Sequence, residues 1–162
     1  MNATQTEAMA AYMAPVTQRV RVESPILRQV PLPFLAGVWP DISSWIVGVV
    51  ERSQGRWTVE TIARQLVDGK WQLWVVWDGE AIKAAVATEL YTEDTGLKLA
   101  RVVFTSGKDA AQWSHLIEEL EDWARDQGAV RFELMARKGW AKHLPDYKLT
   151  HVLLEKDLRH GR

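Results

Sequence analysis

The stretch that decides the fold is KLARVVFTSGKDAAQWSHLIEELEDWARDQGAVRFELMA, residues 98–136. It begins with an apolar run that predicts a strand over Lys98–Thr105. Apolar residues then recur at the i, i+3, i+4, i+7 spacing of a helix face: Ala110, Trp113, Leu116, Ile117, Leu120 and Ala124. Gly128 ends this helix, and the alternating segment Ala129–Ala136 predicts a second strand. A strand, a helix and a strand in this order make a crossover that places the two strands parallel in one sheet.

The chain before this crossover reads as an antiparallel meander. The run WQLWVVW (71–77) is almost entirely apolar, which predicts a strand covered on both faces. Asp78-Gly79 is a two-residue hairpin signal, so Glu80–Tyr91 is expected to be the returning strand. The polar segment TEDTG (92–96) then turns the chain into the first strand of the crossover.

Two helices are expected ahead of the meander. The first is predicted over Asp41–Ser53, with Pro40 in its first turn, where a missing amide hydrogen costs nothing. The second is predicted over Val59–Asp68, with Thr58 as its N-cap and Gly69 just past its end. Both carry one apolar face, so both are expected to pack on the sheet.

The remaining segments are shorter. Arg19–Val22 (RVRV) alternates as a short edge strand would. Residues 25–33 contain three prolines, which allows an extended connector or an edge segment at best. A short helical turn is predicted around Trp140–Leu144, and Tyr147–Glu155 is predicted to be the last strand.

The order of these elements predicts an α+β fold. A mixed sheet is expected, with an antiparallel first half, one parallel βαβ crossover and helices on both faces. We expect a flexible N-terminal arm over 1–24, a single domain over 25–158 and a polar end over 159–162.

Composition excludes several classes of function. The chain has 20 basic and 21 acidic residues and a net charge of −1, so nucleic-acid binding is not expected. It has no cysteine, and its four histidines show no metal-ligand spacing, so no metal site is expected. No continuous apolar run approaches the roughly 18–20 residues of a membrane span, so no membrane partner is expected. These features fit a cytoplasmic protein.

Nine tryptophans are many for 162 residues. Tryptophan buries a large area, and it marks either cores or interfaces. Core packing is one interpretation. The other is a tryptophan-rich surface that, with the N-terminal arm, binds a protein partner or a second copy of the chain.

The ordered set of segments resembles the GNAT superfamily of acyl-CoA-dependent N-acyltransferases over roughly residues 38–158. The segments that carry the resemblance are WQLWVVWDGEAIKAAVATEL, LKLARVVF, WARDQGAVRFEL and GWAKHLPDYKLTHVLLEKDL. The phrase A-x-x-x-G at Ala124–Gly128, followed by a strand, is similar to the central motif of the family. The chain also resembles small GNAT-like proteins encoded by phages, which implies a location in the host cytoplasm or the virion.

The resemblance implies acetyl-CoA as the cofactor. In the family, backbone groups of the third meander strand pair with the pantetheine arm, and the next loop wraps the pyrophosphate at a helix N-terminus. The residues implied here are Val103, Phe104, Thr105, Gly107, Lys108, Asp109 and Ala110. The chain departs from the pattern at Asp109, which is expected to cap the helix instead, and at Trp113. It has Pro145 where a tyrosine acid is expected, and Tyr147 occupies the place of a phenylalanine.

Two carboxylates are the candidates for a general base. Glu89 ends one strand and Glu133 lies within another, and burial of such a carboxylate would raise its pKa. Each also fits an ion-paired or solvent-facing strand residue. Two functions follow: an acetyl-CoA-dependent N-acyltransferase, with amides near Phe104 polarising the carbonyl, or a catalytically silent GNAT-fold structural protein, such as a phage virion or accessory component.

Overall fold

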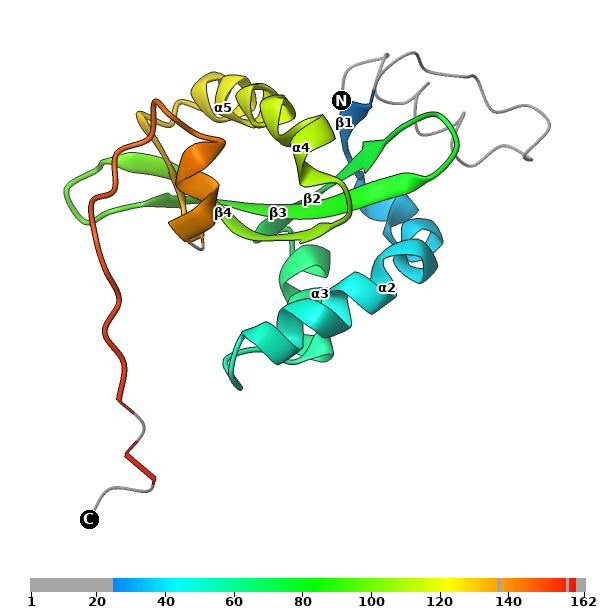
Figure 1. Cartoon of the computed structure of the whole chain (residues 1–162), viewed down its shortest axis with the longest axis horizontal. Helices are drawn as coiled ribbons and strands as arrows, with labels where there is room; N and C mark the ends of the chain where they lie inside the picture. The colour runs from blue at the N-terminus through cyan, green and yellow to red at the C-terminus, as the bar shows by residue number, and fades with distance from the viewer. Residues whose placement is uncertain (1–24, 137, 157, 160–162) are drawn as a thin grey trace.

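A five-stranded mixed sheet forms the centre of the molecule (Figure 1). This computed structural model describes residues 25–136, 138–156 and 158–159. The spatial order follows the sequence order: β1 (Ile26–Gln29), β2 (Trp71–Trp77), β3 (Ile82–Thr92), β4 (Lys98–Gly107) and β5 (Arg131–Leu134). Neighbouring strands are antiparallel from β1 to β4, and β5 is parallel to β4. The α+β fold, the meander and the parallel crossover are therefore confirmed.

Helices cover both faces of the sheet, as Figure 1 shows. On one face lie α2 (Leu35–Arg52), which follows the short 3₁₀ helix η2 (Leu32–Phe34), and α3 (Val59–Val67). On the other lie α4 (Ala110–Trp113), η3 (Ser114–Leu116) and α5 (Ile117–Asp126), joined after β5 by η4 (Lys138–Lys142). The predicted Thr58 cap is present, because its hydroxyl accepts from the Thr61 amide at 3.1 Å.

The two faces have separate hydrophobic cores. Under α2 and α3, the fully buried residues include Ile42, Ile46 and Ile62. Under α4 and α5, Trp74 donates from Nε1 to the buried hydroxyl of Thr88 at 2.8 Å. All nine tryptophans are buried or half-buried, which agrees with the core interpretation of their number.

The first helix begins six residues earlier than predicted, at Leu35. Pro40 therefore lies inside the helix rather than in its first turn. The buried stripe Leu35, Val38, Ile42, Ile46 and Val49 continues through the proline at helical spacing. Burial of this stripe offsets the one hydrogen bond that proline removes.

Segment Leu32–Arg52 is long and apolar enough to cross a membrane by length and composition, with a mean hydropathy of 1.3. No unbroken apolar run of this length occurs in the sequence, but the hydropathy averaged over the segment is high enough to meet the criterion. In the fold the helix packs on β3 and β4 through its buried stripe. Of the most apolar 18 residues in this segment, 22% are buried within the fold, and one helix of this kind is weak evidence for a membrane span.

Three further predictions of local structure differ from the fold. The predicted hairpin is present, because β2 pairs antiparallel with β3, but its loop spans residues 78–81 rather than two residues. In this loop the Asp78 carboxylate accepts from the amides of Glu80 and Ala81, both at 2.9 Å. Turns of this kind form because an aspartate side chain can satisfy amides two and three residues on. The predicted helix of the crossover is interrupted by the 3₁₀ helix η3. Trp113 of this helix is hydrogen-bonded to the preceding turn, as described below.

The third error concerns the predicted last strand, Tyr147–Glu155, which forms no strand. Its ends contact other elements: Tyr147 donates to Glu121 of α5 at 2.5 Å, and Glu155 pairs with Arg56. A strand needs a partner edge, and these contacts hold the segment away from one. The predicted edge strand at 19–22 and the N-terminal arm lie outside the described residues, whereas 26–29 forms the edge strand β1.

Candidate functional site

A β-bulge interrupts the centre of β4. Ala87 of β3 lies opposite Phe104 and Thr88 lies opposite Val102, so Val103 is an extra residue in the ladder. Val103 and Phe104 are consecutive, yet both side chains belong to the core under α2 and α3. The bulge therefore changes the direction in which the β4 backbone groups point from this position onward.

β5 leaves β4 at the same place. The parallel ladder ends at the pair Val102–Leu134, while β4 continues to Gly107 against β3. Within the described residues, no strand pairs with β4 along 103–107 on the side of β5. The two strands therefore part here, which leaves a short edge of β4 backbone groups without a strand partner, the kind of edge to which an extended ligand can pair.

The turn after β4 is tightly packed against β3. The Lys108 amide donates to the Lys83 carbonyl at 2.9 Å. A Cβ atom at Gly107 would lie 2.4 Å from the Lys83 oxygen and 2.5 Å from Ala84, so only glycine fits. The need for glycine at this position therefore comes from strand packing and not from the approach of a phosphate.

An indole closes the same turn from the other side. Trp113 donates from Nε1 to the Lys108 carbonyl at 2.6 Å. Asp109 adopts the left-handed conformation, with φ of 55°, and its side chain makes no capping hydrogen bond. The predicted aspartate cap is therefore wrong, because the left-handed residue does not aim its carboxylate at the helix amides.

The seven predicted cofactor residues fall into two groups. Val103 and Phe104 are buried, so only their backbone groups are available to a ligand. Thr105 is half-buried on the free edge, and the residues of the turn, Gly107, Lys108, Asp109 and Ala110, follow it in sequence and space. The prediction located the strand end correctly, whereas the cofactor roles stay predictions.

A positively charged side chain that the sequence analysis did not single out reaches the end of β4. Arg52, at the end of α2, donates from Nη2 to the Ser106 hydroxyl at 3.2 Å. The two residues are 54 positions apart, so no local pattern could have paired them. Together with the Lys108 side chain, Arg52 supplies positive charge beside the turn.

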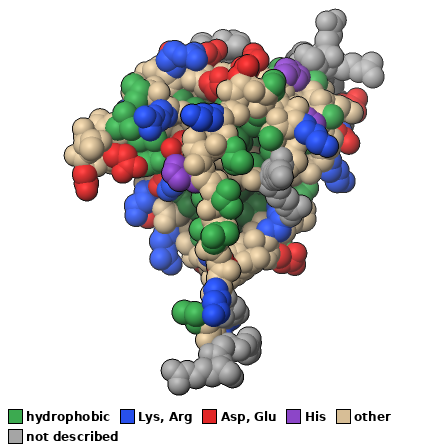
Figure 2. All heavy atoms as spheres, turned by 60° about the vertical axis from the view of Figure 1, so that its left-hand side comes forward, with side chains coloured by type: hydrophobic (Ala, Val, Ile, Leu, Met, Phe, Trp, Pro, Cys, Tyr) green, Lys and Arg blue, Asp and Glu red, His purple; other side chains and the backbone are tan. Residues whose placement is uncertain are grey.

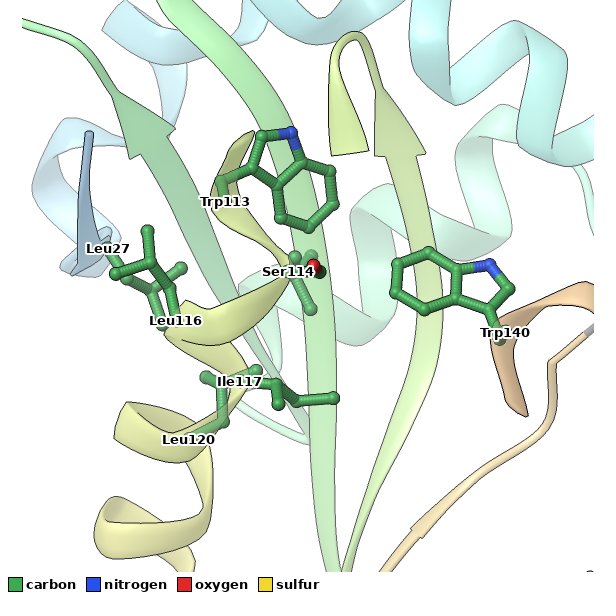
Figure 3. Close-up of a pocket in the computed structure, with 8 residues that line it drawn as sticks. Leu27, Trp113, Ser114, Leu116, Ile117, Leu120 and Trp140 are labelled. Carbon is green, nitrogen blue, oxygen red and sulfur yellow. The ribbon is translucent and has the colours of Figure 1, made fainter. Parts of the chain in front are cut away.

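On the α5 face, the space near the turn is almost filled. Trp113 and Trp140 approach with ring centroids 6.3 Å apart, and Figure 3 shows both indoles over the sheet. The cavity that they help to line measures about 20 Å³ and is apolar. This volume is close to that of a single water position and is far too small for a thioester arm.

The two candidate bases lie in one polar row across three strands. Register places Glu89 opposite Arg101 and Arg101 opposite Glu133. Arg101 donates from Nε to Glu89 at 2.8 Å and pairs with the same oxygen through Nη2 at 2.7 Å. Tyr91 donates to Glu133 at 2.7 Å and lies under the Arg101 guanidinium, 4.8 Å from ring to charge.

This row lies one residue before the place where β5 leaves β4, because Glu133 directly precedes Leu134, which belongs to the last pair of the ladder. Burial and the hydrogen bond to Glu133 raise the pKa of Tyr91 to about 12. Tyr147, at the place of the family's phenylalanine, is bound to Glu121, and burial raises its pKa as well. Neither phenol is therefore ready to lose a proton near neutral pH.

No group of three or more histidine, aspartate or glutamate residues that could hold a metal ion occurs within 25–136, 138–156 and 158–159. The polar row contains two carboxylates and one guanidinium, which suits an ion pair and a proton relay better than a metal.

Several solved structures with a similar arrangement of strands and helices are described as acetyltransferases. A GCN5-related N-acetyltransferase from Ralstonia eutropha JMP134 matches 83% of this chain and 99% of its own, with a TM-score of 0.55 and 14% identity. The chain has the fold of the GCN5-related N-acetyltransferases. The GNAT fold expected from the sequence is thereby confirmed.

Two further structures show the range of proteins with this GNAT fold. An aminoglycoside acetyltransferase from an uncultured soil metagenomic sample has a TM-score of 0.62 and 13% identity, and the match covers 85% of this chain and 99% of that one. A ribosomal-protein-alanine N-acetyltransferase from Brucella melitensis has a TM-score of 0.57 and 15% identity, covering 85% and 100%. No protein-family model matches the sequence, and no curated protein sequence matches it.

Proposed function

We propose that the chain is an acyl-CoA-dependent N-acyltransferase whose donor lies along the free edge of β4. The observation that carries the proposal is the early end of the β4–β5 ladder at Val102–Leu134, beyond which β4 runs unpaired on that side to Gly107. The solved structures of similar fold support transfer to an amine, since one is described as an aminoglycoside acetyltransferase and another as a ribosomal-protein-alanine N-acetyltransferase.

In this proposal the pantetheine arm lies along this edge. Its amide groups can pair with backbone groups of residues 103–107 in the way that an added strand would. An acyl-CoA bound there would supply a thioester: attack by an amine would form the amide bond, break the carbon–sulfur bond and release the CoA thiolate, which takes up a proton from solvent. Backbone amides turned outward by the bulge at Val103 would stabilise negative charge on the thioester oxygen.

The proton lost by the attacking amine requires a base. Glu133 lies one residue before the divergence, and Glu89 is joined to the same row through Arg101. In this proposal one of the two carboxylates takes the proton through a water molecule, since both already accept a hydrogen bond from a neighbouring side chain.

The turn fits a pyrophosphate poorly. Both backbone groups of Lys108 are engaged within the protein, and Asp109 adds a negative charge where phosphates would lie. Arg52 and Lys108 offer side-chain charge, but side chains at the surface hold an anion less firmly than a rigid set of amides. We therefore expect the nucleotide half of the donor to add little affinity.

Calorimetry with two donors tests both parts of the proposal. Acetyl-CoA and S-acetyl-pantetheine, which lacks the nucleotide, are expected to bind with affinities within about threefold of each other. Arg52→Gln should weaken binding of acetyl-CoA by no more than about threefold and leave binding of S-acetyl-pantetheine unchanged, and Arg64→Gln on the exposed side of α3 is the matched control.

Two outcomes would contradict the proposal. No binding of either donor at millimolar concentration would favour the catalytically silent GNAT-fold protein considered from the sequence. Binding of acetyl-CoA at least a hundredfold tighter than that of S-acetyl-pantetheine would show that the turn opens into a phosphate cradle. The phage origin, the cytoplasmic location and a partner bound through the N-terminal arm stay predictions.

A further inference from the structure

A groove lies at the edge of the sheet where β1 ends and β2 begins. Its lining comes from the last residues of β1, from η2, from the first turn of α2, from the end of α3 and from the start of β2. It measures about 230 Å³, whereas the apolar cavity on the α5 face measures about 20 Å³. Buried apolar side chains form much of the lining, among them Val30, Leu35 and Leu66.

The rim of this groove leaves apolar side chains in solvent. Leu32 of η2 lines the groove and is 54% exposed. Val67, which directly follows the lining residue Leu66, is 55% exposed. Exposed apolar groups gathered around an apolar hollow are typical of a surface that binds another segment.

The groove also offers a hydrogen-bonding group for an occupant. The carboxamide of Gln72 is engaged, because it accepts from the Thr88 hydroxyl at 3.3 Å and donates to the Gly69 carbonyl at 3.4 Å. Gln29 lines the groove too and is half-buried. Its carboxamide has no hydrogen-bond partner in the part of the chain that the structure describes.

The N-terminal arm, expected to be flexible as a whole, contains the sequence signals of one short helix. Thr4 and Glu7 have the spacing of a capping box, and Pro15 is a stop signal. A helix of about ten residues is marginal by itself in water, so it needs a surface on which to pack. Three large apolar residues between these signals share one helix face: Met9, Tyr12 and Met13.

We propose that residues 5–14 bind as a helix across the groove of their own chain, with Met9, Tyr12 and Met13 directed into it. The groove has room for such side chains but not for a whole helix. Methionine adapts to irregular apolar space, and the Tyr12 hydroxyl can bond to the carboxamide of Gln29. This docking covers the apolar rim and does not depend on the proposed acyl transfer.

The connection to the groove is long enough. The described chain begins at residue 25, and β1 covers about 13 Å from there to Gln29 at the groove. Residues 15–24 can extend to roughly 33 Å. They can therefore run back past β1 and bring the helix to the groove of the same chain.

The C-terminal tail is another apolar segment that could cover the groove. Figure 2 shows hydrophobic side chains following this tail down the face of the molecule, and Leu153 is 71% exposed. However, Glu155 of the tail pairs with Arg56, which precedes α3, whereas the groove lies at the end of α3. The tail is thus held at the opposite end of that helix, which leaves the N-terminal arm as the occupant.

Methionine methyl NMR tests the proposal on the full chain, which has four methionines and no cysteine. A nitroxide on Val67→Cys, at the rim, is expected to abolish the methyl signals of Met9 and Met13 and to leave that of Met135, beyond β5. In the matched control the nitroxide is on Val130→Cys, which is exposed beside β5, four strands away from β1. It should leave the signals of Met9 and Met13 in place.

Two further samples identify the contact. In the Val67→Cys chain, Tyr12→Lys should restore the signals of Met9 and Met13, because it puts a charge on the buried face of the helix. Ala11→Lys, on the opposite face, should not restore them. A mixture of nitroxide-carrying chains without isotope and isotope-labelled chains without nitroxide should lose no signal.

Two outcomes would overturn the proposal. Signals of Met9 and Met13 that persist beside the nitroxide on Val67→Cys would show that the arm does not occupy the groove. Signals lost in the mixed sample would show that the arm binds a second copy and not its own chain.

Discussion

At the scale of single residues, the structure assigns Gly107 a packing role at the end of β4. The Gly107→Ala variant places a methyl group 2.4–2.5 Å from the backbone of Lys83 and Ala84. We expect it to lower the free energy of unfolding by about 1–3 kcal/mol, because neither strand can move without breaking the ladder.

Urea denaturation measures this cost. Gly139→Ala is the matched control, because a Cβ atom there meets nothing within 4 Å and the change should be within about 0.5 kcal/mol. Equal stability of the two variants would show that β3 and β4 are not in close contact at Gly107.

Tyr91 gives a prediction on pH dependence. Its pKa is raised to about 12 by burial and by Glu133, above the ordinary value of about 10. A group whose pKa is raised on folding stabilises the fold fully below its unfolded value, and this contribution is lost as pH rises through the folded value. We therefore expect part of the stability to disappear between about pH 10 and pH 12.

Chemical denaturation across this alkaline range, compared with Tyr91→Phe, measures the effect. The variant lacks the ionising hydroxyl, so its stability should fall less steeply over the same interval. Parallel curves for the two proteins would mean that Tyr91 titrates normally and that its bond to Glu133 does not form.

At the scale of elements, α2 is the clearest test of how the helices hold the sheet. Ile46 is fully buried and Val47 is 48% exposed, although the two are neighbours. Ile46→Ala should cost about 2–5 kcal/mol, because it leaves a cavity under the sheet. Val47→Ala should change stability by less than about 0.5 kcal/mol, and a larger effect at Val47 would indicate that this face of α2 is covered by something else.

The elements that could be predicted from the sequence are those with a local signal. The Thr58 cap and the apolar spacing from Ala110 to Ala124 are patterns within one turn or one helix. The meander strands were found because apolar runs lay between recognisable turns. The crossover followed from their order.

The elements that could not be predicted depend on distant contacts. The buried stripe of α2 continues through Pro40 because its burial against the sheet offsets the hydrogen bond that proline removes. η3 breaks the crossover helix next to Trp113, whose indole bonds to Lys108. The predicted last strand, Tyr147–Glu155, has the composition of a strand, but a strand also requires a neighbouring edge to pair with, which local sequence does not reveal.

The residues of the candidate site also divide into those with a local signal in the sequence and those that depend on distant contacts. Glu89 and Glu133 could be chosen from the sequence as strand carboxylates, and register then brings both beside Arg101. Arg101 and Tyr91 were missed because their partnership arises only when three strands align. Arg52 was missed for the same reason, since it reaches Ser106 from a different layer.

At the scale of the whole molecule, two layers of helices enclose a sheet that opens between β4 and β5. The open edge at residues 103–107 is the place where the GNAT fold is proposed to receive its donor. The closed turn at Lys108 and the two indoles near it leave the backbone edge as the main binding element.

Amide hydrogen exchange at this edge tests the central claim most directly. With acetyl-CoA at ten times its dissociation constant, amides of residues 103–107 that point away from β3 should exchange about tenfold more slowly. Amides of Leu99–Val102, already paired with β5, should change little and serve as the internal control. Unchanged exchange along 103–107 in the presence of saturating donor would contradict the account.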